Sequence, residues 1–156
     1  MTELLVAILV IGLGALGAAG LQLASSKNSR SALEGTTAVI LAQDMAERLR
    51  ANPQGAYAGV AGGSMPPGFV DCLAANCTPP ELAFFDIAVW KCSLGRWRAH
   101  GACGEARAAG ALPPEEQQPG LPMGDGAIDW GANGEFTISV TWQAADPRRV
   151  ALPGRR

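Results

Sequence analysis

The sequence predicts an α+β protein in which the first half of a long N-terminal α-helix spans a membrane and a small antiparallel sheet packs on the second half. Three observations indicate this fold class. Residues 4–26 are mostly apolar and carry no charge. Apolar residues then recur near the helical period as far as residue 52. Finally, apolar and polar residues alternate over 135–143, as in a strand with one buried face.

The N-terminal segment has the length of a membrane-spanning helix. About 20 apolar residues in helical form cross a hydrocarbon core of roughly 30 Å, and Leu4 to Leu23 has that length. Glu3 stands directly before this run. Because an ionisable group in the membrane costs about 2.5–3.5 kcal/mol on insertion scales, with partial relief near a helix end, we expect Glu3 to have a partner.

A cleaved secretory signal is the alternative for this segment. Such signals have a basic start and an apolar core of about 7–15 residues. This segment begins with an acid, is longer and continues into an amphipathic helix, so we favour a retained helix. The run contains four glycines: Gly12, Gly14, Gly17 and Gly20. Small residues let helices approach closely in lipid, so these glycines indicate packing on neighbouring helices or, because glycine has low helix propensity, a helix that can loosen.

The helix is expected to continue to Asn52. Asp44 and Arg48 form an i,i+4 pair, and Pro53 disfavours helix at the residue before it. The result is one helix of about 50 residues. The apolar residues that recur along its second half are Leu33, Ile40, Leu41, Met45 and Leu49.

Residues 53–123 form a loop-rich, cysteine-containing region with a short helix. Gln54 to Val70 is rich in Gly and Pro and indicates an irregular connection. Thr78, Pro79 and Glu81 have the spacing of a capping box at a helix start. One apolar face is then expected from Leu82, Phe85, Val89 and Cys92. Gly95 to Met123 is expected to be mostly loop because of four prolines: Pro113, Pro114, Pro119 and Pro122.

Residues 124–152 are expected to form antiparallel strands. The clearest is Glu135 to Gln143, whose apolar side chains should cover the helix around Ile40, Met45 and Leu49. Ala127 to Trp130 can pair with it through a turn at 131–134, and Arg149 to Leu152 can add an edge strand. The predicted division is therefore a membrane or filament-core helix, 1–26, and a head, 27–156, of which 27–52 is the amphipathic helix.

No catalytic or cofactor site is evident in the sequence. His100 is the only histidine and lies in an expected loop, the acids are scattered, and no phosphate loop is found. With 14 acids against 12 Lys and Arg residues, nothing indicates nucleic-acid binding. We therefore expect no enzyme activity, no cofactor and no metal.

Four cysteines indicate an oxidising compartment. Their spacings fit no common zinc pairing, so disulfides are favoured over a zinc site. Of the three pairings that four cysteines allow, we expect the two that close short loops. These are Cys72 with Cys77 and Cys92 with Cys103.

The N-terminal segment resembles type IV pilins, and most of all the minor pilins called PilV, the pilus modification proteins. The residues that carry the resemblance run from Thr2-Glu3-Leu4-Leu5 to Val10 and continue through Gly12, Leu16-Gly17 and Gly20-Leu21-Gln22. The likeness is specific over roughly the first fifty residues. In that family a short basic leader ending in glycine and a methylated aromatic residue precede the glutamate. This chain begins at Met1, two positions before Glu3, so the prepilin peptidase is an expected partner if a leader lies upstream.

The resemblance implies a structural subunit that takes part in initiation or tip assembly of type IV pili, which serve twitching motility and cell adhesion. It implies that Glu3 pairs with the N-terminal amine of an adjoining subunit. The implied partners are other minor pilins, the major pilin, the inner-membrane assembly platform and the inner membrane itself.

The charges and the cysteines favour opposite orientations of the helix in the membrane. Lys27 and Arg30 are the first cations after the apolar run, and alone they would place the N-terminus outside. The cysteines and the family's basic leader favour the opposite orientation. We therefore expect a single pass through a bacterial inner membrane, with the C-terminal domain in the periplasm and later in the pilus.

Two other functions fit the same pattern. A minor pseudopilin of a type II secretion system has a similar N-terminal segment. A single-pass anchored periplasmic binding module would use residues 72–122 as its recognition surface, and Glu3 would then be incidental.

Overall fold

The computed structural model describes residues 1–118, 120–143 and 147–155. It divides into two compact units, Met1–Glu34 and Gly35–Arg156. The elements in chain order are α1 (Thr2–Ala51), α2 (Pro79–Leu94), α3 (Gly101–Ala108), β1 (Asp125–Trp130), a short 3₁₀ turn (Ala132–Gly134), β2 (Glu135–Gln143) and β3 (Pro147–Arg155). The α+β fold class predicted from the sequence is confirmed.

The predicted long helix is present as a single element, α1. It ends where the sequence indicates: the Asn52 amide donates to the Arg48 carbonyl at 3.0 Å, and Pro53 follows. Its first part contains a stretch that is long and apolar enough to cross a membrane and that none of the described residues buries.

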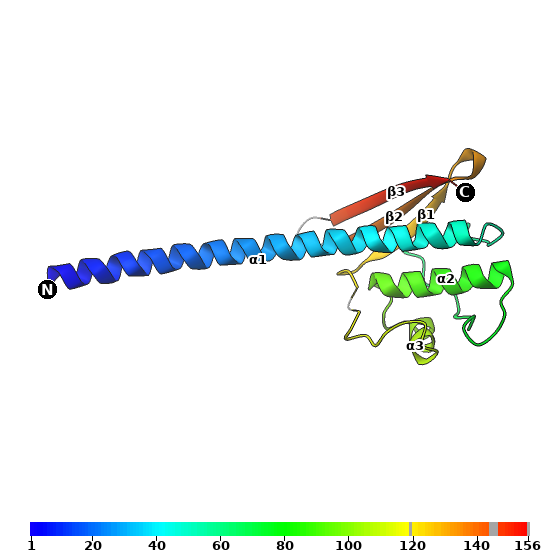
Figure 1. Cartoon of the computed structure of the whole chain (residues 1–156), viewed down its shortest axis with the longest axis horizontal. Coiled ribbons are helices and arrows are strands. Elements are labelled where there is room, and N and C mark those ends of the chain that lie inside the picture. The colour runs from blue at the N-terminus through cyan, green and yellow to red at the C-terminus, as the bar shows by residue number, and fades with distance from the viewer. Residues whose placement is uncertain (119, 144–146, 156) are drawn as a thin grey trace. The chain divides into compact units, whose positions relative to one another are not determined.

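In the second unit, one face of α1 is buried against the sheet and α2. The residues on this face are Ala38, Ala42, Met45, Ala46 and Leu49. Three of the five are alanines, and small side chains let the packed elements approach the helix closely. Figure 1 shows β1, β2 and β3 on one side of this part of α1 and α2 alongside it.

The expected contact at Ile40 is wrong. Ile40 is 58% exposed, whereas Ala38 and Ala42 are fully buried. Residues two positions apart on an α-helix differ by about 200° in direction, so Ile40 lies on the side opposite these alanines. The helical period is therefore correct, but side-chain size does not select the buried face.

The three strands form one antiparallel sheet in the order β1-β2-β3. Ile138 of β2 lies opposite Ile128 of β1 and Leu152 of β3. The buried face of β2 consists of Phe136, Ile138, Val140 and Trp142. The predicted bounds of β2 are confirmed, while β1 begins two residues earlier than expected and β3 extends beyond the expected edge strand at both ends.

Gly126 lets this sheet lie close to α2. A Cβ atom at Gly126 would collide with the Trp90 ring, and the Trp90 indole N–H donates to the Leu41 carbonyl of α1 at 2.9 Å. The Trp90 side chain, which comes from α2, therefore contacts both α1 and the sheet. Any larger residue at position 126 would have to push the sheet away from it.

The helix α2 begins at the predicted cap but has two buried faces where the sequence predicts one. Ala83, Ile87, Trp90 and Leu94 belong to the cluster with α1 and the sheet. The predicted face of Phe85, Val89 and Cys92 belongs to a second cluster, which includes Cys103 and Ala106 of α3. α2 is thus the central layer between α1 and α3.

Helix α3 corrects the prediction that residues 95–123 are mostly loop. Its buried residues are Ala102, Cys103 and Ala106, and its N-terminal cap is His100, whose Nδ1 accepts from the Ala102 amide at 3.3 Å. Eight residues with two glycines have little helical tendency alone, so packing against α2 and the bond from Cys103 to Cys92 fix this helix. Pro119 lies outside the described residues.

The buried face of α1 gives a first prediction. Met45→Ala should lower the free energy of unfolding by about 2–5 kcal/mol, because it leaves a cavity at a fully buried position. Ile40→Ala is the matched control on the same helix and should change it by less than about 0.5 kcal/mol, since surface changes have small effects. Urea unfolding of the full chain in detergent, followed by tryptophan fluorescence, measures both. Equal losses would contradict the assignment of the buried face.

Candidate functional site

Glu3 lies in the first turn of α1. It is exposed, as are all residues from 1 to 30. A carboxylate at a helix N-terminus is favoured by the helix dipole, worth about 0.3–1 kcal/mol. This small effect on the stability of the helix would be enough to explain an acid at this position. The role of Glu3 between subunits stays a prediction.

The four glycines of the apolar segment lie on open helix surface. A Cβ atom added at Gly12, Gly14, Gly17 or Gly20 would meet no other described atom within 4 Å. At about 100° per residue they spread over about 200° of the helix circumference. No contact within the chain therefore requires glycine at these positions, and the expected packing on neighbouring helices stays a prediction.

A network of polar side chains joins α1 to α2 and to the loop between them. Arg48 contacts Asp86 at 2.8 Å and Asp44 at 2.9 Å. The Tyr57 hydroxyl donates to the second Asp86 oxygen at 2.5 Å. Burial alone would lower the pKa of Arg48, but the hydrogen bonds to Asp86 and Asp44 raise it overall, so the guanidinium is a permanent cation at this joint.

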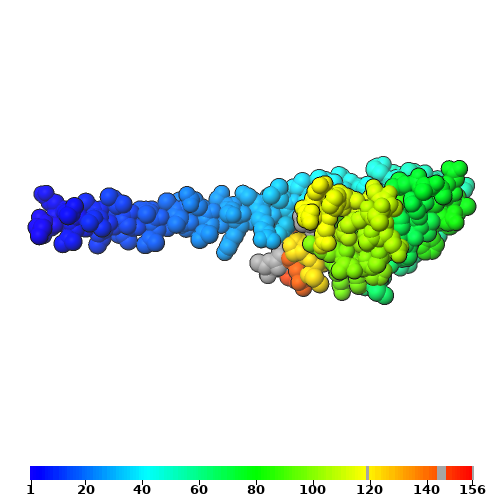
Figure 2. Space-filling view, turned by 90° about the horizontal axis from the view of Figure 1, so that it is seen from below, coloured from blue at the N-terminus to red at the C-terminus, as the bar shows by residue number. Residues whose placement is uncertain are grey.

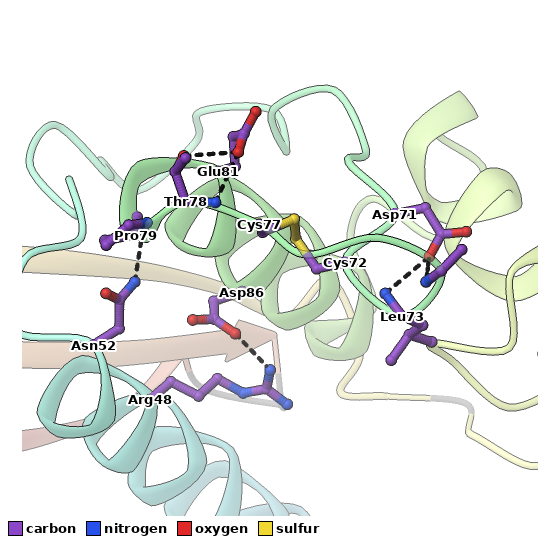
Figure 3. Close-up of a disulfide and its surroundings, with 11 residues drawn as sticks. Arg48, Asn52, Asp71, Cys72, Leu73, Cys77, Thr78, Pro79, Glu81 and Asp86 are labelled. Atoms are coloured by element: carbon purple, nitrogen blue, oxygen red, sulfur yellow. Dashed lines mark hydrogen bonds and ion pairs between the residues drawn. A yellow bond between two sulfur atoms is a disulfide. The ribbon is translucent and has the colours of Figure 1, made fainter.

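Asn52 extends this network to the start of α2. Its side-chain amide donates to the Pro79 carbonyl at 2.7 Å and to the Tyr57 hydroxyl at 3.2 Å. Figure 3 shows Arg48 reaching Asp86 and Asn52 reaching Pro79. The end of α1 is thus tied to α2 at two successive points.

The second polar group of the head is a buried ion pair between α2 and β1. Lys91 is completely buried, and its ammonium donates to Asp125 Oδ1 at 2.8 Å and to the carbonyls of Gly126 at 2.7 Å and Ala61 at 2.9 Å. Asp125 also accepts from the Gly63 amide at 2.6 Å. All three ammonium N–H groups are used, which a buried charge requires.

The protonation states of this pair follow from its surroundings. Burial lowers the pKa of Lys91, and the bond to Asp125 only partly offsets this. Burial alone would raise the pKa of Asp125, yet hydrogen bonds from Lys91, Gly63 and Gly126 lower it overall. Asp125 is therefore ionised at neutral pH, and the pair fixes the loop at 61–63 against the sheet.

The disulfides join the neighbouring cysteines, as the sequence predicts. Cys72 and Cys77 are bonded with a Cα–Cα distance of 5.5 Å, and Cys92 and Cys103 with 5.4 Å. The first closes a short loop directly before α2 (Figure 3). The second links the end of α2 to α3 within a buried cluster.

The predicted capping box follows the first disulfide. Glu81 accepts from the Thr78 amide at 2.8 Å and from the Thr78 hydroxyl at 2.7 Å. These side-chain and backbone bonds from Thr78 lower the pKa of Glu81. Asp71 similarly accepts from two backbone amides on the other side of the disulfide (Figure 3), so the short loop is held at both ends.

The predicted site residues do not converge on one chemical centre. Glu3 and the glycines share the first unit, the cysteines form two separate pairs, and His100 caps α3. Within the described ranges no three His, Cys, Asp or Glu side chains lie close enough together to hold a metal ion. Figure 2 shows residues of the cysteine-containing region, coloured green to yellow, over much of the visible face of the second unit.

Sequence reasoning missed Lys91 and Asp125. One signal was present: Lys91 is the only cation in the apolar stretch from Leu82 to Leu94, where a solvated lysine is out of place. Its partner has no such signal, because Asp125 lies between two glycines, a pattern typical of a turn. The link between them depends on tertiary structure.

Residues 20–88 match a protein family described as Tt1218-like, type IV pilin Tt1218. The chain is similar to type IV pilins. The predicted likeness at that level is confirmed, while the narrower likeness to PilV stays a prediction. Neither a curated protein nor a solved structure matches the chain at a significant level. The matched range begins at Gly20, inside the apolar part of α1, and ends within α2, so Glu3 lies outside it.

The likeness to type IV pilins over residues 20–88 and an apolar helix long enough to cross a membrane both suggest a membrane-anchored structural subunit. The matched range also includes Arg48, Tyr57 and Asp86, which join α1 to α2. The match therefore covers the polar contacts that hold α1 against α2.

The buried ion pair gives a second prediction. Lys91→Met should cost about 3–5 kcal/mol at pH 7, because it removes the buried counter-ion at 2.8 Å and leaves the Asp125 carboxylate with the more exposed Arg96 at 3.4 Å. In the parent, the lowered pKa of Asp125 adds stability above the unfolded pKa near 3.8, and this is lost as the pH falls through the folded value. In the variant the pKa of Asp125 should rise, so the loss relative to the parent should shrink as the pH falls from 7 to 4.

Urea unfolding across this pH range measures the difference. Arg50→Gln is the control, because Arg50 is exposed and pairs with Glu47 on the surface, and its effect should stay below about 1 kcal/mol at every pH. A Lys91→Met penalty that is independent of pH would contradict the role given to Asp125.

The disulfides give a third prediction. Peptide mapping of the oxidised protein should find Cys72 joined to Cys77 and Cys92 joined to Cys103. Cys92→Ser with Cys103→Ser should destabilise the head more than Cys72→Ser with Cys77→Ser, since the former pair is buried and the latter partly exposed. Each loss should be roughly 2–4 kcal/mol in thermal or urea unfolding. A Cys72–Cys103 peptide, or the reverse order of stability, would overturn this assignment.

Proposed function

We propose that this protein is a minor pilin of the PilV type, a non-enzymatic structural subunit in initiation or tip assembly of type IV pili. The observation that carries the proposal is that the two parts of α1 differ in burial. Its first part has no burying partner among the described residues, and its second part is the buried support of a folded head. A helix of this kind has one half available for lipid or for neighbouring helices.

The proposed division of labour follows the chain. Residues 1–26 act as the membrane anchor and later as the filament-core helix, and residues 27–156 act as a periplasmic head. The two disulfides support this location, because such bonds persist in oxidising compartments. The N-terminus then lies on the cytoplasmic side before assembly, and the subunit passes from the inner membrane to the pilus.

Glu3 is the residue to which we assign register. In the filament core its carboxylate pairs with the N-terminal amine of an adjoining subunit. A buried charge that loses its partner costs about 3–5 kcal/mol, so misaligned stacking is disfavoured. The proposed partners are other minor pilins, the major pilin and the inner-membrane assembly platform, with the prepilin peptidase acting on a leader.

The test is a pair of acid-to-amide substitutions on the same helix. Glu3→Gln should insert in the membrane and fold normally but should be recovered in sheared pili at least tenfold less than the parent. Glu34→Gln is the control, because Glu34 pairs with Arg30 on the helix surface and should not affect incorporation. Immunoblots of sheared filaments and of membrane fractions measure both steps.

Normal recovery of Glu3→Gln in filaments would contradict the assembly role of Glu3. An anchored binding module would tolerate that change and would be absent from filaments altogether. Recovery of the parent with type II secretion components, instead of pilus components, would favour the pseudopilin function.

A further inference from the structure

A cavity of about 380 Å³ lies in the second unit, where the sheet meets the chain that follows α2. Arg96, shortly after α2, lines one part of it, and the start of β1, the end of β2 and the start of β3 line the rest. The residues that define its chemistry are Arg96, Asp125, Thr141, Trp142, Arg148 and Arg149. None of these belongs to the proposed assembly segment, so a ligand site here is independent of the proposed function.

Three guanidinium groups gather at this cavity. Arg96, Arg148 and Arg149 all line it, and arginine is charged at every physiological pH. Among the described lining residues the one carboxylate is Asp125, which is already engaged by the Lys91 ammonium at 2.8 Å, by Arg96 at 3.4 Å and by the backbone amides of Gly63 and Gly126. The described lining residues, three arginines and one carboxylate, therefore carry a net positive charge.

The strand register places two of the wall residues side by side. Thr141 of β2 lies directly opposite Arg149 of β3 and, on its other side, opposite Asp125 of β1. Residues opposite each other on neighbouring strands have Cβ atoms about 4.5–5.5 Å apart on the same face of the sheet. The Thr141 hydroxyl donates to the Asp125 carbonyl at 3.5 Å, so Arg149 is the member of this pair that can donate to a ligand.

Two of the arginines are held in position by contacts within the head. Arg149 Nη2 donates to the Ser139 hydroxyl at 2.6 Å. Arg96 Nη1 lies 3.4 Å from Asp125 Oδ2, and its backbone amide donates to the Gly124 carbonyl at 3.0 Å. A guanidinium has five N–H groups, so each of these contacts leaves further donors for a ligand.

The remaining wall of the cavity is partly apolar. Trp142 is 4% exposed and Met123 is 54% exposed, and both line it. A cavity of a few hundred cubic ångströms with an apolar wall and a few charged groups has the dimensions of a small-molecule site. Arginine is the residue best suited to carboxylate and phosphate groups, because its planar fork donates two parallel hydrogen bonds.

We propose that this cavity binds a small organic anion through a carboxylate or phosphate group. Arg96, Arg148 and Arg149 contact the charged group, and Trp142 with Met123 contacts the carbon skeleton. The head would then carry a recognition site separate from any contact made by α1.

The test is calorimetric titration of the full chain in a non-ionic detergent at low ionic strength, where charge interactions are least screened. The probes are D-glucuronate as a small organic carboxylate, inorganic phosphate, and D-glucose as the neutral control. Glucuronate should bind and glucose should not. Arg148→Gln should weaken glucuronate binding by about tenfold, the lower end of what a charge-assisted hydrogen bond contributes.

Arg50→Gln is the matched control, because it removes the same charge from the surface of α1, where Arg50 pairs with Glu47. It should leave glucuronate binding within about twofold of the parent. Arg96→Gln provides a second wall variant, and near-ultraviolet circular dichroism confirms that each variant is folded. Binding that is stronger for glucuronate than for phosphate supports an organic carboxylate, and equal binding supports a general oxyanion site.

Three results would overturn the proposal. They are the absence of heat and of any tryptophan fluorescence change with both anions, equal binding of glucose, and equal weakening by Arg50→Gln and Arg148→Gln. The last would mean that net charge, and not the cavity, attracts the anion.

Discussion

The small-residue face of α1 is the constraint on which the head depends. Ala38, Ala42 and Ala46 are at most 1% exposed, and their small side chains let the sheet and α2 approach a helix segment that also buries Met45 and Leu49. Trp90 fills the space that remains and donates its indole N–H to the backbone of α1 at Leu41. Close packing makes cores of this kind sensitive to single methylene groups. The sheet and α2 therefore pack close to the backbone of α1 at these alanines.

Two polar groups then determine how the irregular loops attach to this core. Arg48 with Asp86 and Tyr57 holds the end of α1 against α2. Lys91 with Asp125 holds the glycine-rich loop against the sheet. Buried ion pairs contribute little net stability over apolar replacements, but the loss of one partner is costly. Their effect here is to specify one arrangement for loops that have few apolar residues of their own.

This architecture agrees with the role of a filament subunit. None of the described residues buries the apolar part of α1, which leaves this part available to lipid or to other helices. The head is meanwhile stabilised by its own core, two disulfides and internal polar groups. The residues that stabilise the head are thus different from those of the apolar segment. The arginine-lined cavity beside β3 is one example of what the surface of the head can present.

Local patterns in the sequence are sufficient to predict the main elements. The bounds of β2, the end of α1 near Asn52-Pro53 and the start of α2 after Thr78 follow from alternation, proline geometry and a capping box, all of which act over a few residues. The neighbouring cysteine pairs follow from short loop closure. The type IV pilin likeness likewise comes from the order of residues at the N-terminus, and the family match supports it over residues 20–88.

Only the tertiary structure decided which faces are buried and which charges meet. A hydrophobicity pattern favours Ile40 over Ala38 for the core, because it does not reveal that close approach favours the smaller side chain. Helix α3 escapes prediction because its stability comes from α2 and from the bond to Cys92. The ion pair of Lys91 and Asp125 joins residues from distant parts of the chain, as does the cavity wall that brings Arg96 to the start of β3. These residues become neighbours only after the sheet packs on the helices. The sequence by itself determined the long helix α1 with its apolar segment, the start of α2 and the strand β2, since these depend on local periodicity and caps, whereas long-range packing determined α3, the head's interior and its candidate binding site.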